Sequence, residues 1–335
     1  MSSVTLTLEA ARDLAHAVLT AHRTSPANAG SVAKALVAAE ADGQPGHGLS
    51  RLPAYAGQAA SGKVDGFAVP RVEPAGRAAV RIDASHGFAY PALDLAVAEL
   101  SRLAPDSGIA AAAIHRSHHC GMAGLPVEHL ARTGLAALLF ANSPKAMAPW
   151  GGTAALYGTN PIAFAAPRYG AEPLLIDLSL SKVARGKVML AAREGRPIPE
   201  DWALDAEGHP TTDPDAALAG SMLPMGEAKG AALALAVEIL AAGLTGACLG
   251  FEAGSFFTAE GEPPGVGQLL IAFAPGPLSG GTFAERLETL LGAVEAQDGT
   301  RLPGTRRSVT RAQARETGVA ISQDLHAQLL GLANS

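Results

Sequence analysis

A histidine and an arginine lie four residues apart in the glycine-rich segment Gly46-His47-Gly48-Leu49-Ser50-Arg51. Glycine on both sides of His47 leaves the imidazole accessible on flexible backbone, which suits a proton donor beside a substrate. Arg51 follows within one turn, at the start of a predicted helix, and a guanidinium is the natural two-point partner of a carboxylate. The pair therefore indicates acid–base chemistry on a carboxylate-bearing substrate, although an ordinary loop histidine and a surface arginine would have the same sequence.

A second polar segment, HRSHHCGMAG, runs from residue 115 to residue 124 and contains three histidines and a cysteine. These residue types ligate zinc, but adjacent His118 and His119 point in opposite directions in extended or helical backbone. No second cluster supplies the remaining tetrahedral ligands either, so we expect no metal site. The small residues after Cys120 instead favour a loop that admits a ligand close to its backbone.

Four further segments combine polar side chains with turn residues. Each of them, taken alone, also has the sequence of an ordinary turn, strand end, helix start or basic loop. The segments are Gly158-Thr159-Asn160-Pro161, Asp177-Leu178-Ser179, Lys229-Gly230 and Arg301-Leu302-Pro303-Gly304-Thr305-Arg306-Arg307.

The sequence contains none of the common nucleotide or hydrolase motifs. A GxGxxG fingerprint is missing, because Gly265-Val266-Gly267 lacks the third glycine and leads into a predicted strand. The motifs GxxxxGK[ST], GxSxG and HExxH and the EF-hand loop are also absent. The residues alone therefore give no support to a standard dinucleotide-binding fold.

The composition excludes several classes of protein. The 335 residues are 48% hydrophobic and 17% charged, which is typical of a well-buried globular protein. A net charge of −6 argues against nucleic-acid binding. The one basic cluster, Arg301, Arg306 and Arg307, is large enough to hold a single phosphate group.

Cysteine usage and hydropathy indicate where the protein works. Cys120 and Cys248 are the only cysteines, which argues against a disulfide framework and favours a reducing compartment. The N-terminal segment lacks the pattern of a secretion signal. The most apolar stretch, 231–249, carries Glu238 at its middle and suits a buried helix better than a membrane span. We expect a cytoplasmic protein that binds neither nucleic acid nor membrane.

The elements that position these segments follow from hydrophobic periodicity and from capping residues such as Thr7 and Ser25-Pro26. Helices are predicted over 8–22, 27–42, 50–60, 91–103, 126–133, 229–244 and 283–296, with two short helices closing the chain. Strands are predicted over 69–72, 78–82, 109–114, 135–140, 162–165, 174–177 and 269–274. Residues 193–224 are predicted to be mostly connection, and 301–307 a loop. The alternation of strands and helices in the middle of the chain by itself favours a parallel sheet.

Taken together and in this order, the segments resemble the type-2 malate/L-lactate dehydrogenase family. The resemblance spans roughly residues 5 to 330 and includes several long matching runs. These are HGxxR at 47–51, SHHxGxAG at 117–124, GTNPIAFAAP at 158–167, DLSxSxVARGK at 177–187, PTTDP at 210–214, KGxxLAL at 229–235, LTGA at 244–247 and the RxPG loop near the end.

The resemblance implies an α/β fold that is not a Rossmann fold, with a largely antiparallel cofactor-binding sheet beside a helical substrate-side region, in a homodimer. It places the helical region at 1–115, with the C-terminal helices packing back onto it. The NAD(P)-binding domain is expected at 116–300, and the cofactor loop with the C-terminal helices at 301–335. The antiparallel sheet that it implies replaces the parallel one suggested by the alternation of elements.

The resemblance also implies roles for individual residues. His47 is similar to the family's proton donor and Arg51 to its substrate-carboxylate ligand. Close relatives often have serine immediately before the catalytic histidine, where this chain has Gly46, so another group must orient His47; Asp177 and His119 are the candidates. We count Asp177 with His47 as catalytic. The cofactor site is expected to contain His119, Cys120, Gly121, Met122, Ala123, Thr159, Asp177, Leu178, Ser179, Lys229, Gly230, Arg301, Leu302, Pro303, Gly304, Thr305, Arg306 and Arg307.

Within the family, SHHCG and DLSLSxVARGK most resemble reductases of cyclic ketimine carboxylates. The expected reaction is NADPH-dependent reduction of Δ1-pyrroline-2-carboxylate to L-proline and of Δ1-piperideine-2-carboxylate to L-pipecolate. Dehydrogenation of a 2-hydroxy acid such as malate, lactate, ureidoglycolate or sulfolactate is the alternative, and a non-catalytic nucleotide-binding protein is a remote one. NADPH is expected over NADH, with Arg306 or Arg307 near the 2′-phosphate.

Overall fold

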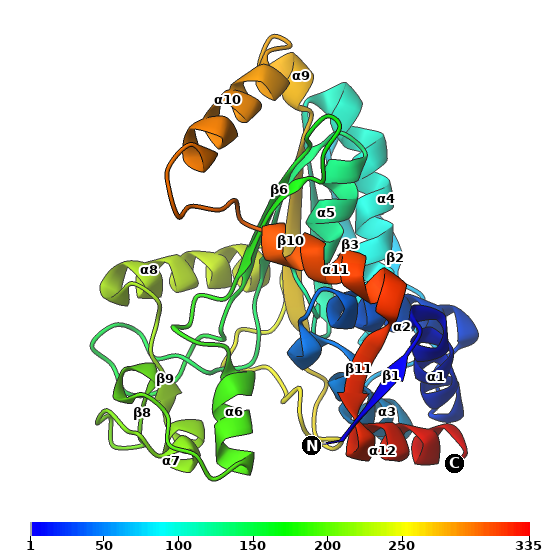
Figure 1. Ribbon diagram of the computed structural model, residues 1–335, viewed down its shortest axis with the longest axis vertical. Coiled ribbons are helices and arrows are strands. Elements are labelled where there is room, and N and C mark those ends of the chain that lie inside the picture. The colour runs from blue at the N-terminus through cyan, green and yellow to red at the C-terminus, as the bar shows by residue number, and fades with distance from the viewer. Residues whose placement is uncertain (1) are drawn as a thin grey trace.

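A seven-stranded sheet forms the centre of the computed structural model, which describes residues 2–335 (Figure 1). Its strands, in spatial order, are β2 (Arg71–Pro74), β3 (Ala79–Asp83), β4 (Ile109–Ser117), β10 (Val266–Phe273), β5 (Ala136–Ala141), β6 (Ile162–Ala166) and β7 (Leu174–Leu178). Every neighbouring pair is antiparallel except β3 and β4. The largely antiparallel sheet implied by the family resemblance is confirmed.

The position of β10 explains why the order of elements pointed to a parallel sheet. Helix α5 (Gly124–Arg132) connects β4 to β5, as in a parallel crossover unit. Strand β10, which comes from far along the chain, lies between β4 and β5 and pairs antiparallel with both. The two strands therefore run in the same direction without being neighbours.

Helices α4 (Ala89–Ser107) and α5 cover one face of the sheet (Figure 1). The core between them is rich in alanine: Ala112 on β4, Ala137 on β5 and Ala163 on β6 are fully buried there with Leu100 of α4. Small side chains on the strands allow the helices to approach the sheet closely. This packing fixes both ends of the segment between β4 and α5, which carries His118 and His119.

A helical region lies beside the lower end of the sheet and has its own core. Its helices are α1 (Leu8–Ala21), α2 (Pro26–Ala41), α3 (Leu52–Ser61) and α12 (Gln323–Ala333), and α11 (Thr305–Thr317) crosses between this region and the sheet. Thr7 and Ser25 cap α1 and α2 as predicted. The two ends of the chain meet because β1 (Ser3–Leu6) pairs with β11 (Val319–Ser322) and α12 packs on α1.

A third group of elements packs around a smaller core on the other side of the sheet. It contains α6 (Arg185–Arg193), the 3-10 turn η3 (Glu200–Trp202), β8 (Ala203–Leu204), α7 (Pro214–Ala219), β9 (Ser221–Met222) and α8 (Glu227–Glu238). The short elements within 193–224 were predicted as connection, because two-residue strands leave no periodicity to detect. The α-helical pattern of α8 ends at Glu238 and continues as a π turn, η4 (Ile239–Gly243). Helices α9 (Pro275–Leu278) and α10 (Phe283–Glu295) extend from the end of β10.

Two predicted boundaries bear on the site. The loop predicted over 301–307 is wrong in its second half, because Thr305, Arg306 and Arg307 form the first turn of α11. Gly304 adopts φ +86° just before it and begins the helix. The predicted domain boundary at residue 115 falls within β4, and the structure places β2, β3 and β4 in the central sheet. Among residues 2–335, no helix is long and apolar enough to span a membrane.

Candidate active site

His47 and Arg51 lie on two consecutive 3-10 turns, η1 (Pro45–His47) and η2 (Leu49–Arg51), between α2 and α3. The Glu40 carboxylate of α2 holds these turns in place by accepting a hydrogen bond from the Leu49 N–H at 2.8 Å. Gly48 passes so close to this carboxylate that any side chain there would clash with it. The two turns are therefore held against α2, and a side chain at position 48 would have to displace the Glu40 carboxylate that holds them.

The Arg51 guanidinium carries a positive charge that no carboxylate offsets. Its Nε donates to the Gly46 carbonyl oxygen at 2.7 Å, and its Cζ lies 5.0 Å from the centroid of the Phe257 ring. Across the described chain, no ion pair to Arg51 is present. These contacts orient the guanidinium and leave both terminal nitrogens for a ligand, as two-point binding of a carboxylate requires.

The His47 imidazole stacks on that of His119, with ring centroids 5.3 Å apart and planes 19° from parallel. His47 Nδ1 is enclosed and has no hydrogen-bond partner within residues 2–335. Burial, followed by the charges of Arg51 and Arg307, lowers the pKa of His47 to about 4. The free imidazole is therefore neutral at pH 7.

His118 and His119 have separate hydrogen-bond partners. His118 Nε2 bonds the Gln58 side-chain oxygen at 2.7 Å, whereas His119 Nδ1 bonds the Tyr55 hydroxyl at 2.7 Å. Burial also raises the pKa of the Cys120 thiol to about 12, so the free thiol is unreactive at neutral pH. These side chains do not converge on a common point.

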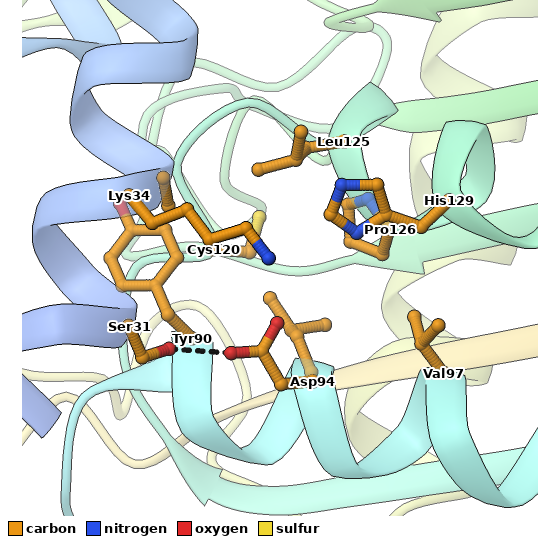
Figure 2. Close-up of a pocket in the computed structure, with 11 residues that line it drawn as sticks. Ser31, Lys34, Tyr90, Asp94, Val97, Cys120, Leu125, Pro126 and His129 are labelled. Carbon is orange, nitrogen blue, oxygen red and sulfur yellow. Dashed lines mark hydrogen bonds between the residues drawn. The ribbon is translucent and has the colours of Figure 1, made fainter. Parts of the chain in front are cut away.

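The Cys120 side chain, predicted at the cofactor, borders a small cavity between α2, α4 and α5 (Figure 2). The cavity, about 20 Å³, has room for about one water molecule. Lys34, Asp94 and His129 line it with Tyr90. The loop that follows requires glycine at position 121. Gly121 has φ +65°, and a Cβ there would lie 2.5 Å from the Tyr90 hydroxyl.

Asp177, at the end of β7, links α5 to α11. Its Oδ2 accepts a hydrogen bond from the Gly124 N–H at 2.9 Å, at the start of α5, and lies 3.1 Å from Arg307 Nη1. A Cβ on Gly124 would meet both side chains, which explains glycine at that position. In the part of the chain that the structure describes, no hydrogen bond joins Asp177 to His47. Asp177 thus holds Arg307 and α5, and the His47 ring instead stacks on that of His119.

The remaining predicted cofactor segments meet around the end of β7. The Thr159 carbonyl accepts from the Leu180 N–H at 2.8 Å, and the Leu180 carbonyl accepts from the Met225 N–H at 2.8 Å, two residues before α8. Lys229 is exposed in the first turn of α8, where Gly230 has no room for a side chain against Met225. On the other side, a Cβ on Gly304 would lie 3.0 Å from the Leu175 carbonyl oxygen. Three segments that are distant in the sequence therefore border β7 and the turn that follows it.

The charges of this region fit a nicotinamide dinucleotide. Gly121, Gly124 and Gly230 let the segments around them pack closely against Tyr90, Asp177 and Met225. Exposed cations at Lys229, Arg301 and Arg306 suit the phosphates of the dinucleotide. Met122 and Ala123 are buried, Leu178 is 37% exposed, Ser179 is half-buried, Leu302 is buried, and Pro303 and Thr305 are exposed.

Sequence reasoning missed a buried carboxylate that supports this region. Glu238 accepts hydrogen bonds from Asn160 Nδ2 at 2.8 Å, Asn142 Nδ2 at 3.1 Å and the Gly250 N–H at 2.6 Å. These bonds tie the turn that follows Thr159 to the end of α8. A lone glutamate in an otherwise apolar helix was the available signal, but it was used only to argue against a membrane span. Tyr55, Tyr90 and Glu40 were also missed, because nothing in their sequence neighbourhood links them to His47.

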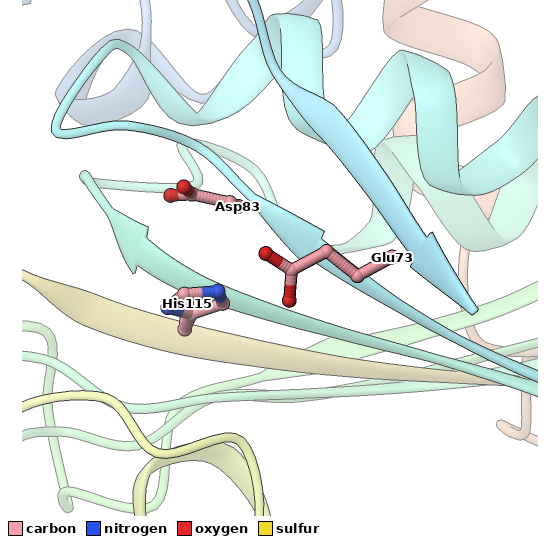
Figure 3. A group of neighbouring side chains, drawn as sticks. All are labelled: Glu73, Asp83 and His115. Atoms are coloured by element: carbon pink, nitrogen blue, oxygen red, sulfur yellow. The ribbon is translucent and has the colours of Figure 1, made fainter. Parts of the chain in front are cut away.

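A second cluster of potential metal ligands lies at one edge of the sheet. Oxygen or nitrogen atoms of Glu73, Asp83 and His115 lie within 4.8 Å of one another (Figure 3). Arg81 bonds Glu73 at 2.9 Å and His115 Nδ1 at 3.3 Å, and Arg116 pairs with Asp83. Because both carboxylates already have guanidinium partners, we interpret the cluster as an ion-pair network at the ends of β3 and β4.

Comparison with known proteins agrees with the geometry. The family model for malate/L-lactate dehydrogenase matches residues 6–330. The chain is 57% identical to a (2R)-3-sulfolactate dehydrogenase (NADP(+)) of Chromohalobacter salexigens over 93% of both chains. It is 44% identical to a Δ1-pyrroline-2-carboxylate/Δ1-piperideine-2-carboxylate reductase of Pseudomonas syringae pv. tomato, over 93% of this chain and 91% of that one. The crystal structure of a Δ1-piperideine-2-carboxylate reductase from that organism superposes with a TM-score of 0.92 and 43% identity, covering 98% of this chain and 99% of the other.

Proposed function

Because this chain belongs to the malate/L-lactate dehydrogenase family and is an NAD(P)H-dependent oxidoreductase, we propose that it acts on the carbon next to the carboxylate of a small 2-hydroxy, 2-oxo or 2-imino acid. The observation that carries this proposal is the unpaired Arg51 guanidinium one turn from His47. A carboxylate bound by Arg51 would hold its neighbouring carbon within reach of the stacked histidines.

The nicotinamide, when bound, supplies or accepts the hydride. His47 exchanges the proton: its Nε2 gives a proton to the developing alkoxide or amine during reduction and takes one from the hydroxyl during oxidation. The low pKa of the free imidazole suits the base of the oxidation direction. In the reduction direction, the substrate carboxylate offsets the charge of Arg51, which is the second cause of the low pKa after burial, and so raises the proton affinity of His47.

Two substrate classes have specific support. The relative at 57% identity is named for (2R)-3-sulfolactate, so a 2-hydroxy acid of this kind, with the corresponding 2-oxo acid, is our first candidate. Cyclic ketimine carboxylates, which the sequence motifs favour, are the second, supported by relatives at 37–44% identity. Both classes present a carboxylate to Arg51 beside a carbon bonded to oxygen or nitrogen.

We propose NADPH as the preferred cofactor. The name of the 57% identical relative includes NADP(+), and exposed Arg301 and Arg306 lie around the start of α11. Arg307 is less suited to the 2′-phosphate than the sequence indicated, because Asp177 already pairs with it. Arg306 is therefore our candidate for that contact.

We also propose that the protein is a homodimer. Helix α8 and its π turn expose Leu233, Leu235 and Ile239 by 43%, 44% and 57%, and Leu244 just beyond is 64% exposed. Leu290 of α10 is 61% exposed although that helix is amphipathic. Apolar side chains gathered on exposed helices are typical of a subunit interface. Light scattering coupled to gel filtration would measure the mass directly, and a monomer at micromolar concentration would contradict this proposal.

A substrate panel tests the proposed reaction. Purified protein is assayed with NADPH and NADH against 3-sulfopyruvate, Δ1-pyrroline-2-carboxylate, Δ1-piperideine-2-carboxylate, oxaloacetate, pyruvate and 2-oxoglutarate, and with NADP⁺ against (2R)-3-sulfolactate. Turnover should require the carboxylate, so 1-pyrroline, which lacks it, is the matched control. Equal rates with Δ1-pyrroline-2-carboxylate and 1-pyrroline would contradict the role of Arg51. Turnover of none of these acids would contradict the proposed function.

A further inference from the structure

A chain of hydrogen bonds leads from the interior of the protein to the candidate site. The Tyr90 and Tyr55 hydroxyls lie 3.1 Å apart, and the Tyr55 hydroxyl lies 2.7 Å from His119 Nδ1. Tyr90 is 4% exposed, Tyr55 is fully buried and His119 is 9% exposed. The three residues come from α4, α3 and the end of β4, so the chain connects three separately packed elements.

The supply of donors and acceptors sets the direction of this chain. If Tyr90 donates to Tyr55 and Tyr55 donates to His119 Nδ1, each hydroxyl proton has an acceptor. In the reverse direction, the Tyr90 proton has no protein acceptor among residues 2–335 and depends on a water in the small cavity that Tyr90 lines. Only the first direction gives both hydroxyl protons an acceptor within the protein, so we infer that direction. Nδ1 of His119 is then an acceptor, and the ring proton is on Nε2.

The Nε2 atoms of His119 and His47 face the open side of the site. Neither atom has a hydrogen-bond partner in the described chain, and neither is among the enclosed unpartnered atoms, whereas His47 Nδ1 is. Because the two rings are stacked within 19° of parallel, both can serve one ligand between Arg51 and the cofactor segments. The Phe256 ring, with its centroid 5.1 Å from that of His119, shields the imidazole on another side.

We propose that Tyr90 and Tyr55 hold His119 as a neutral imidazole with its proton on Nε2, so that His119 donates a hydrogen bond to the reacting oxygen or nitrogen of the substrate beside His47. His119 is then a catalytic residue that transfers no proton, and Tyr55 and Tyr90 are positioning residues. This inference rests on the proposed reductase function. Preorganised donors aimed at developing negative charge are a principal source of rate acceleration in enzymes.

The electrostatics of the site agree with a neutral donor. Burial, followed by the charge of Arg51, holds the pKa of His119 well below its ordinary value. Burial also raises the pKa of Tyr55 to about 12, so the hydroxyl keeps the proton that it donates. The chain further explains how His47 is oriented without a side chain at Gly46, because it fixes the ring on which His47 stacks.

Nitrogen-15 NMR of the histidine rings tests the tautomer without any need for turnover. The His119 signals are assigned by comparison with His119→Asn. We expect a protonated Nε2 and a bare, hydrogen-bonded Nδ1 at pH 7 in the wild type, and a mixture of tautomers in Tyr55→Phe. A proton on Nδ1 of the wild type, or an unchanged spectrum in Tyr55→Phe, would overturn the proposal.

Steady-state kinetics test the role of His119 and its two tyrosines in the reaction. Tyr55→Phe should lower kcat about tenfold with little change in KM, less than the roughly 10²–10³-fold lost when such a donor is removed outright. Tyr90→Phe should have a smaller effect in the same direction, and Tyr169→Phe, an exposed control, should have none. The double variant Tyr55→Phe/Tyr90→Phe leaves no tyrosine hydroxyl without a partner. It replaces the single variants in the kinetic test if one of them unfolds.

The kinetic outcomes separate this inference from the proposed function. If the wild type turns over substrate but kcat is unchanged in both Tyr55→Phe and the double variant, the inference is overturned and the proposed function is upheld. Absence of turnover in the wild type across the substrate panel would instead contradict the function, and the NMR result would still decide the tautomer.

Discussion

The substrate-side turns, 45–51, and the segment 301–307, which leads into α11, each carry an arginine expected from sequence to bind an anionic ligand. Arg51 has only a backbone carbonyl and an aromatic ring as partners. Arg307 lies 3.1 Å from the carboxylate of Asp177 and 4.0 Å from that of Asp42. Arginine in a loop next to a site is thus not sufficient to predict anion binding. The absence or presence of a counter-charge decides whether the guanidinium serves a ligand or the fold.

Helical spacing explains the roles of the arginines on α11. Arg307 and Arg311 are four residues apart and therefore share one face of the helix. Arg311 bonds the buried Asp42 and Glu128, and these bonds raise its pKa. Arg306, one position earlier, is exposed. The face of α11 that carries Arg311 is thus joined to α2 and α5 by ion pairs. Arg306, on the other face, is exposed to solvent.

The largest effect should come from the substrate-side turns. His47→Ala should lower kcat by roughly 10²–10⁴-fold, the usual contribution of a positioned acid or base. The dissociation constant for NADPH, measured by fluorescence titration, should barely change. Near-normal turnover would remove His47 from the chemistry, and His16→Ala on α1 is the control.

Arg307→Ala should lower the free energy of unfolding rather than kcat. Removing this guanidinium leaves the half-buried Asp177 carboxylate with the Gly124 N–H as its only partner among the described residues. Loss of one partner from a buried pair costs about 3 kcal/mol. Urea unfolding monitored by circular dichroism should show this loss, and Arg307→Ala/Asp177→Asn should recover part of it. A fully stable single variant would mean that Arg307 does not hold α11 in place.

Arg51→Lys should weaken substrate binding with little effect on stability. Lysine keeps the charge but cannot reproduce the planar two-point contact. The predicted loss in kcat/KM corresponds to about 1.5–3 kcal/mol, the range for a hydrogen bond to a charged group. If the urea midpoint of unfolding fell together with kcat/KM, Arg51 would stabilise the fold as Arg307 does. The two regions would then not differ in the way proposed here.

The sequence predicted most long elements, because amphipathic periodicity and caps such as Thr7 and Ser25 act locally. It did not predict from local pattern that β10 would pair between β4 and β5, since strand pairing across roughly 130 to 160 residues leaves no local trace. The antiparallel sheet came from family resemblance alone. The first turn of α11 was missed because Pro303-Gly304 looks like a loop, whereas Gly304 begins the helix.

The candidate site shows the same division. His47 and Arg51 could be found because the two residues lie on one short segment. The tyrosine chain behind His119 could not, because Tyr55, Tyr90 and His119 meet only after α3, α4 and β4 have packed. Gly48 and Gly124 were visible as glycines, but the carboxylates packed against them, Glu40 on α2 and Asp177 at the end of β7, lie on other elements.

Arg306→Ala tests the remaining cation of the terminal segment. One exposed charge-assisted contact to a 2′-phosphate should favour NADPH by about 0.5–1 kcal/mol, so the variant should narrow the NADPH-to-NADH ratio of kcat/KM by about two- to fivefold. Arg315→Ala, an exposed arginine further along the same helix, is the matched control. An unchanged ratio would assign cofactor selection to another part of the protein.

The smallest predicted effect is the response of hydroxy-acid oxidation to mild acid. Oxidation needs neutral His47 as the base, and kcat/KM reports the pKa of the free enzyme. A histidine with an ordinary pKa of about 6.5 would be mostly protonated at pH 5.5 and would lose roughly tenfold in kcat/KM relative to pH 7.5. Because burial and the nearby arginines lower the pKa of His47 to about 4, the imidazole stays neutral at pH 5.5 and the loss should be less than twofold. Circular dichroism at both pH values controls for unfolding. A tenfold loss in a folded protein would mean that the site around His47 is more open to water than its enclosed Nδ1 indicates.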